Sequence, residues 1–141
     1  MISSTFYVAL FSSFVSVERG GLIDASGAGY SAVRGPGKGS GTVGGSYASS
    51  GGRSSKGTQY GSLFRPLFPG SGGACGAGGG HLYIEAGDHV IVDGAIMSDG
   101  RGSGSSSSGG GSGGSVMIKT LYFKGYGTVS CNGGEFTNFQ N

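Results

Sequence analysis

The residues of this chain best suited to chemistry are its two cysteines and two histidines. Cys75 and Cys131 are a candidate disulfide pair if the protein is secreted, but Cys131 equally suits a small core position, so both interpretations stay open. His81 and His89 do not stand at metal-ligand spacing with each other or with the cysteines. We therefore predict no metal site and expect both histidines at solvated strand ends.

Three aspartates, Asp88, Asp93 and Asp99, raise the question of sugar-cleaving chemistry. Enzymes of that kind need paired carboxylates, or Ca²⁺-binding acids, on one face. A later stretch of the chain with the same residue pattern offers Lys119 and Gly127 at the matching places, so no acidic cluster builds up. We predict no enzyme, no catalytic residue and no cofactor.

Glycine dominates the composition, with 35 of 141 residues, and only 11% of the residues are charged. Three prolines and the lack of a strict Gly-X-Y period exclude a collagen triple helix. Alternating β-branched and aromatic residues argue against disorder. The nine basic residues are scattered singly and the net charge is +2, so we predict no nucleic-acid partner.

A repeated pattern gives the strongest indication of the fold. Residues 80–100 and 114–133 match when they are aligned, and residues 22–27 match the closing half of both. Repetition of this kind is typical of stacked units that complete each other's core. The aligned aliphatic positions predict one core column, made of Ile23, Ile96 and Val129. The aligned small positions predict a second column beside it, made of Ala25, Ser98 and Cys131.

The end of each repeat predicts a shared corner. A polar residue and then a glycine align there in all three copies: Ser26 and Gly27, Asp99 and Gly100, Asn132 and Gly133. Such pairs favour turns with a positive φ angle. Between the corners, alternation predicts that Leu82, Ile84, Val90 and Val92 point inward. Columns of like residues predict an all-β fold, a parallel β-helix or solenoid with long Gly/Ser-rich loops.

We predict a single domain over residues 1–141. Its expected parts are the first strands over 1–26, a glycine-rich excursion over 27–80, two coils over 81–134 and a short tail over 135–141. The Gly/Ser run over 101–114 is expected to bulge from the stack as a loop. Spaced aromatic residues in the excursion are expected to fold it back against the flank of the stack.

The apolar run over residues 6–17 has two interpretations. It is about as long as the core of a signal peptide, but no basic residues precede it and no clear cleavage site follows it. The alternative is a strand pair that leads into the first repeat. The run is too short to span a bilayer, so we predict no membrane insertion.

The glycine clusters and the short β segments between them resemble the glycine-rich repeats of large secreted and cell-surface proteins. The resemblance is carried by residues 21–30, 70–73, 78–85, 92–100, 109–118 and 127–134. Those repeats are similar to right-handed parallel β-helices of adhesin and extracellular-fibre type. The resemblance implies a structural or adhesive role outside the cell or at its surface. Where such repeats usually carry Ala before Asn-Gly-Gly, this chain has Cys131.

From these patterns we expect an extracellular structural protein. Its main partner is expected to be itself, because unpaired strand edges that meet head to tail without closing give a filament or fibre. The alternative is a surface adhesin or carbohydrate-binding module of a larger secreted protein. In that case the outer aromatic residues Tyr83, Tyr122 and Tyr126 would present a face to glycans.

Overall fold

The computed structural model describes residues 7–52, 57–102, 104 and 108–135, and strands are the only regular elements among them. In chain order the strands are β1 (Tyr7–Val17), β2 (Leu22–Asp24), β3 (His81–Val92), β4 (Ala95–Met97), β5 (Ser115–Lys119), β6 (Tyr122–Lys124) and β7 (Thr128–Ser130). Residues 1–6 and 136–141, which belong to the predicted first strands and tail, lie outside the described residues.

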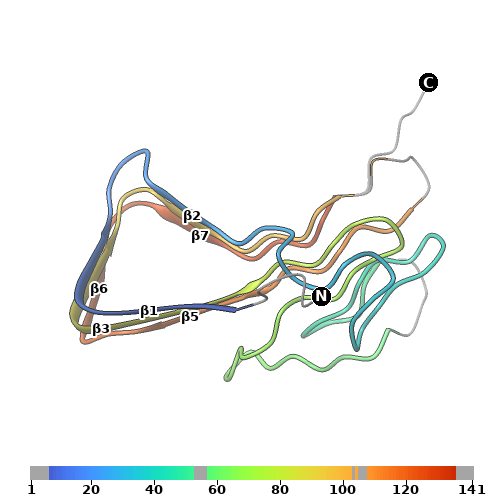
Figure 1. Ribbon diagram of the computed structural model, residues 1–141, viewed down its shortest axis with the longest axis horizontal. Helices are drawn as coiled ribbons and strands as arrows, with labels where there is room; N and C mark the ends of the chain where they lie inside the picture. Colours follow the sequence, from blue (N-terminus) through green and yellow to red (C-terminus); the bar gives the residue numbers. More distant parts are fainter. Residues whose placement is uncertain (1–6, 53–56, 103, 105–107, 136–141) are drawn as a thin grey trace, which may run out of the picture.

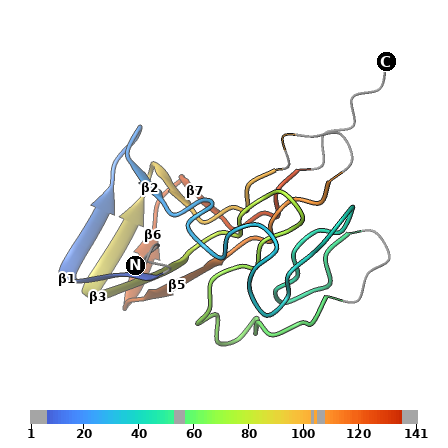
Figure 2. The ribbon, with the colours of Figure 1, turned by 45° about the vertical axis from the view of Figure 1, so that its right-hand side comes forward.

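The strands lie in three successive passes of the chain, and all of their pairings are parallel (Figure 1). The first pass contains β1 and β2, the second β3 and β4, and the third β5, β6 and β7. One sheet has the order β1-β3-β5, with β6 also paired to β3, and the other has the order β2-β4-β7. Figure 2 shows the passes side by side.

The core lies between the two sheets and follows from alternation along the strands. Leu82, Ile84, Val90 and Val92 of β3 are buried, as the alternation predicts. The buried cluster also includes other residues of all three passes and of the segments between them: Val17, Ala25, Ala86 and Ile96, with Val15, Ile23, Ala28, Val116 and Ile118 packed against it. Full burial of each large aliphatic side chain contributes about 1.5–3 kcal/mol.

The predicted closed parallel β-helix or solenoid is wrong. The described chain is all-β with parallel strands, but the strands form two small sheets of four and three strands, and no third sheet among the described residues closes the circuit. On the remaining side the chain is rich in glycine and offers few side chains that could face an interior. In the second and third passes, the segments before and after the strands therefore come together backbone to backbone, and the side-chain core ends there (Figure 1).

The glycine-rich segments on that side pack in an arrangement that we call the glycine bundle. Its segments are residues 25–30, 37–46, 70–73, 76–80, 98–101, 109–114 and 131–134. A strand in a sheet has neighbours on two sides only. Residues 109–114, by contrast, form backbone hydrogen bonds with five of the other segments. The predicted loop over 101–114 is therefore wrong for residues 109–114, which lie inside the bundle.

Contacts along residues 109–114 repeat every three residues. Gly111 and Gly114 face residues 77–80, Gly110 and Gly113 face residues 131–134, and Gly109 and Ser112 face Val43 and Ser71. Three residues per turn is the period of a polyproline II chain, which has no internal hydrogen bonds and leaves its backbone groups for neighbours. At most of these positions an added Cβ would overlap backbone atoms of the next segment, so the bundle requires glycine there.

The excursion is held against the bundle by aromatic residues. The rings of Tyr47 and Tyr60 meet edge to face with their centroids 5.1 Å apart. The Tyr60 hydroxyl donates to the Pro69 carbonyl at 2.5 Å and accepts from the Ser71 hydroxyl at 2.9 Å. Burial raises the pKa of Tyr60 to about 12. These contacts hold Tyr47 and the residues around it against the bundle.

Candidate functional site

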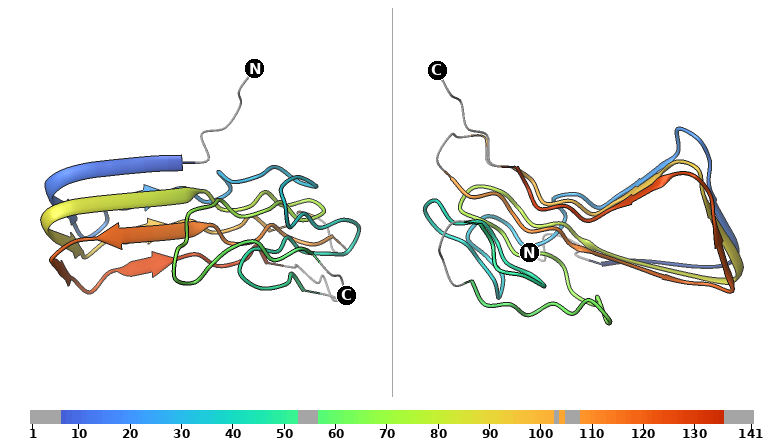
Figure 3. Two further views of the ribbon diagram at one scale, coloured as in Figure 1. Left: turned by 90° about the horizontal axis from the view of Figure 1, so that it is seen from below. Right: turned by 180° about the vertical axis from the view of Figure 1, so that it is seen from behind.

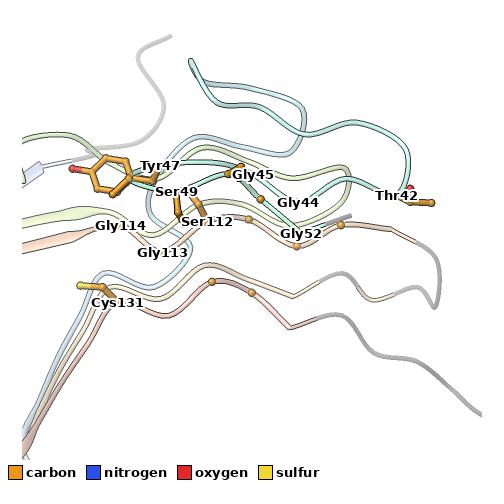
Figure 4. A pocket seen from close by; sticks show the side chains of 18 residues that line it. Thr42, Gly44, Gly45, Tyr47, Ser49, Gly52, Ser112, Gly113, Gly114 and Cys131 are labelled. Atoms are coloured by element: carbon orange, nitrogen blue, oxygen red, sulfur yellow. The ribbon is translucent and has the colours of Figure 1, made fainter. Parts of the chain in front are cut away.

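A hollow of about 490 Å³ opens along the third pass of the glycine bundle (Figure 4). Residues 109–114 form its floor, residues 44–52 form one wall, and Cys131, Gly133 and Gly134 form the other. Most of the lining is therefore glycine backbone, and Ser112 is one of the few polar side chains. Backbone N–H and C=O groups are the chemistry that such a surface offers to a ligand.

The predicted corner residues lie side by side and are joined through Asp99. That carboxylate accepts hydrogen bonds from the Ser130 hydroxyl at 2.5 Å and from the Asn132 N–H at 2.6 Å. The Asp99 N–H in turn donates to the Ser26 hydroxyl at 3.1 Å. Asp99 of the second pass thus contacts the third pass through its carboxylate and the first pass through its backbone N–H, which aligns the three corners.

The reason for glycine at the corner differs from the prediction. Among the three aligned glycines Gly27 has a positive φ, of 68°, whereas Gly100 and Gly133 do not. A Cβ at Gly100 would overlap the backbone of residues 111 and 112, so close approach is the constraint there. A Cβ at Gly133 would find its nearest neighbour at 3.8 Å, an ordinary contact.

The two predicted columns are placed in register by the strands. Ile23 pairs with Ile96, and Ile96 pairs with Val129. Ile96 is fully buried between the sheets, but Val129, on the third pass, is 43% exposed. In the small column, Ala25 and Ser98 are buried, and the Ser98 hydroxyl donates to the Gly80 carbonyl at 2.6 Å. The prediction of a core position is wrong for Cys131, which is exposed because no further pass covers the third.

The candidate disulfide between Cys75 and Cys131 is not formed, because both thiols are free. The Cys75 N–H donates to the Gly109 carbonyl, whereas the backbone of Cys131 lies against Gly113. Four residues of extended chain separate those two positions, or about 12 Å at ~3.1 Å per residue. That exceeds the ~7 Å between Cα atoms that a disulfide tolerates. Burial and the Asp99 carboxylate raise the pKa of the Cys131 thiol.

The expectation of a solvated His81 is wrong, because its side chain is buried. The Ser115 hydroxyl donates to the Phe68 carbonyl at 2.8 Å, so its oxygen accepts the Nδ1 proton of His81 at 2.6 Å. The ring also stacks on Tyr7, with the centroids 5.1 Å apart. Burial lowers the pKa of His81 below its ordinary value of 6.5.

We expect this histidine to make stability depend on pH. As the pH falls below about 6.5, the unfolded chain takes up a proton at His81 while the folded chain still resists it, so the free energy of unfolding decreases. Urea midpoints should therefore be lower at pH 5 than at pH 7.5. His81→Asn, which keeps a donor near Ser115, should weaken this dependence. His89→Asn is the matched control, and an equal effect from it would contradict the assignment.

The acids are engaged individually rather than gathered at one site. Asp93 accepts from the Tyr126 N–H at 3.0 Å, Asp88 pairs with His89 at 2.9 Å, and Glu85 lies 3.7 Å from Lys119. Across the described ranges there is no group of three or more His, Cys, Asp or Glu side chains that could hold a metal ion. Within those same ranges, no helix has the length and apolar character needed to cross a membrane.

Both ends of the stack expose apolar side chains. On the first pass these are Tyr7, Val8, Leu10, Phe11, Phe14 and Leu22. On the third pass they are Leu121, Tyr122, Phe123, Tyr126 and Val129. Within the described residues, no strand pairs with the outer edges of β1, β2, β5, β6 or β7, as Figure 3 shows from the side. The edges therefore offer both unpaired backbone groups and apolar surface.

The fold and site define an all-β protein in which two small parallel sheets are joined to a glycine bundle. Comparison with known proteins found no matching family model, no matching curated protein and no matching solved structure.

Proposed function

We propose that the protein is a structural subunit that associates with further copies of itself, end to end, through the open strand edges of its first and third passes. The extracellular or cell-surface location that the sequence resemblance implies is part of this proposal. The observation that carries it is the register of the strands, which repeats from pass to pass.

The register of the strands supports a contact between two copies of the chain. Leu10 pairs with Ile84, which pairs with Ile118, and Val15 pairs with Val90, which pairs with Phe123. If the same step is applied once more, Leu10 of the next copy lies opposite Ile118. Its Val15 and Ile23 then lie opposite Phe123 and Val129.

Each of these contacts brings together apolar side chains that are at least partly exposed in the single chain. Parallel pairing is satisfied automatically, since all passes run in the same direction. A head-to-tail contact uses different surfaces on the two copies, so it does not close on a dimer and continues as a filament. Unpaired edges of this kind favour such association.

The test is sedimentation velocity over a range of protein concentrations, together with electron microscopy of the purified chain. We expect the wild type to form elongated assemblies as the concentration rises. Phe123→Lys, at a side chain that is 55% exposed on the third pass, should leave the protein folded and monomeric. Leu63→Lys, at a side chain that is 84% exposed in the excursion, is the matched control and should assemble as the wild type does.

Two outcomes would overturn the proposal. One is a wild-type protein that stays monomeric at all concentrations. The other is a Phe123→Lys variant that assembles as well as the Leu63→Lys control.

A further inference from the structure

Five segments of the bundle surround residues 109–114, but one side of this stretch is covered by no described segment. The hollow lies on that side. The N–H groups of Gly111 and Gly114 donate to residues 101 and 98, and the N–H of Ser112 donates to Ser71. The carbonyls of residues 109–112 accept from Cys75, Gly45, Gly134 and Gly79 in that order. These bonds account for the five neighbouring segments of the bundle.

Two donors on the floor of the hollow are left over. The N–H groups of Gly110 and Gly113 have no hydrogen-bond partner among the described residues. Both residues line the hollow. They are three residues apart, so in a chain with three residues per turn both N–H groups point to the same side. Gly110 is buried and Gly113 is half-buried, and both donors border the hollow, so an acceptor placed there would supply the partner that the fold does not.

The glycines of the two walls give a second, independent indication that the hollow binds a ligand. Gly44, Gly52 and Gly133 line the hollow, and none of them has a positive φ. A Cβ at Gly44 or Gly133 would make only ordinary contacts, and a Cβ at Gly52 would meet nothing within 4 Å. The single chain therefore does not require glycine at these three positions. At most other glycines of the bundle another backbone passes closely, and Gly27 and Gly41 have a positive φ instead.

We propose that the hollow binds an extended glycine-rich segment of another polypeptide. Its carbonyl groups, spaced three residues apart, accept the N–H groups of Gly110 and Gly113, and its backbone passes close to Gly44, Gly52 and Gly133. The contact continues the packing that already joins the bundle's own segments. Six residues of polyproline II chain span about 16 Å, which matches the length of the floor. This inference does not rest on the proposed assembly, which uses the strand edges instead.

The probe is a labelled peptide with the chain's own sequence over residues 109–116, Gly-Gly-Gly-Ser-Gly-Gly-Ser-Val. Binding is followed by fluorescence anisotropy and by NMR. We expect saturable binding that shifts the amide signals of Gly110 and Gly113. The same peptide with Ala in place of every Gly should not bind, because its methyl groups would not fit between the walls.

Protein variants locate the site. Gly52→Tyr adds a side chain at the wall of the hollow, at a position where its Cβ would meet nothing within 4 Å, and should weaken peptide binding at least tenfold. Gly87→Tyr is the matched control, at an exposed glycine away from the hollow whose Cβ would approach only Ser13, at 4.0 Å, and it should bind as the wild type does. The inference is overturned by no binding at millimolar peptide, by equal binding of the alanine peptide, or by amide shifts that respond to oligosaccharides and not to the peptide.

The same variants separate this inference from the proposed assembly. Phe123→Lys should bind the peptide although it does not assemble. If Phe123→Lys fails to assemble and no variant binds the peptide, the inference about the hollow fails alone. If the peptide binds and the wild type never assembles, the proposed function fails alone.

Discussion

Replacing Gly111 with alanine is expected to destabilise the protein by about 3 kcal/mol, the upper end of the roughly 1–3 kcal/mol that overpacking costs, because the surroundings are rigid. The new Cβ would overlap the carbonyl of Ala77, and the atoms it meets are backbone atoms that cannot rotate away. Displacing residues 109–114 would also strain their hydrogen bonds to five other segments. Since a domain is stable by only about 5–15 kcal/mol, Gly111→Val should not fold.

The measurement is urea unfolding followed by circular dichroism, with Gly52→Ala as the control. Both glycines line the same hollow, and neither has a positive φ. A Cβ at Gly52 meets nothing, so Gly52→Ala should be neutral, or stabilising by about 0.4–1 kcal/mol through the unfolded chain. If Gly111→Ala is as stable as Gly52→Ala, the backbone packing described for the bundle is incorrect.

Truncation of Ile96 to alanine should cost about 2–5 kcal/mol, the range for a fully buried aliphatic side chain. Ile96 has no exposed surface and pairs with Ile23 on one side and Val129 on the other. The sheets meet around it, so the space left by the lost side chain cannot collapse without moving all three passes.

Leu22→Ala is the control for that change. Leu22 is on the neighbouring strand of the same sheet, but its side chain is 57% exposed, so its loss should cost less than about 1 kcal/mol. Denaturant midpoints at unchanged m-value would measure both effects. Equal costs for the two variants would contradict the placement of the core between the sheets.

Side-chain patterns in the sequence predict the strands and their register well. The alignment of Ile23, Ile96 and Val129 corresponds to three paired positions, and the inward residues of β3 are the buried ones. These features depend on side-chain type, which hydrophobic periodicity reports directly. The same patterns led to a closed β-helix, because they do not show what completes the circuit on the glycine-rich side.

The glycine bundle could not be predicted in this way, because its contacts are between backbones. Residues 109–114 have the composition of a flexible linker, and the three-residue period of their contacts appears in the fold rather than in the residue types. Gly100 illustrates the difficulty, since the sequence suggests a turn with positive φ and the structure shows a close approach instead. His81 was misplaced for a related reason, because its cover includes Ser115 of the next pass and the Phe68 carbonyl of the excursion.

The absence of side chains in the bundle has a consequence for how this protein tolerates sequence change. In most proteins the hydrophobic strands accept few substitutions, and a tract of glycine and serine accepts many. In a saturation-mutagenesis experiment on this protein we expect part of that pattern to be reversed. The low-complexity tract at 109–114 should tolerate few substitutions, whereas exposed strand positions such as Leu22 should tolerate many without loss of folding.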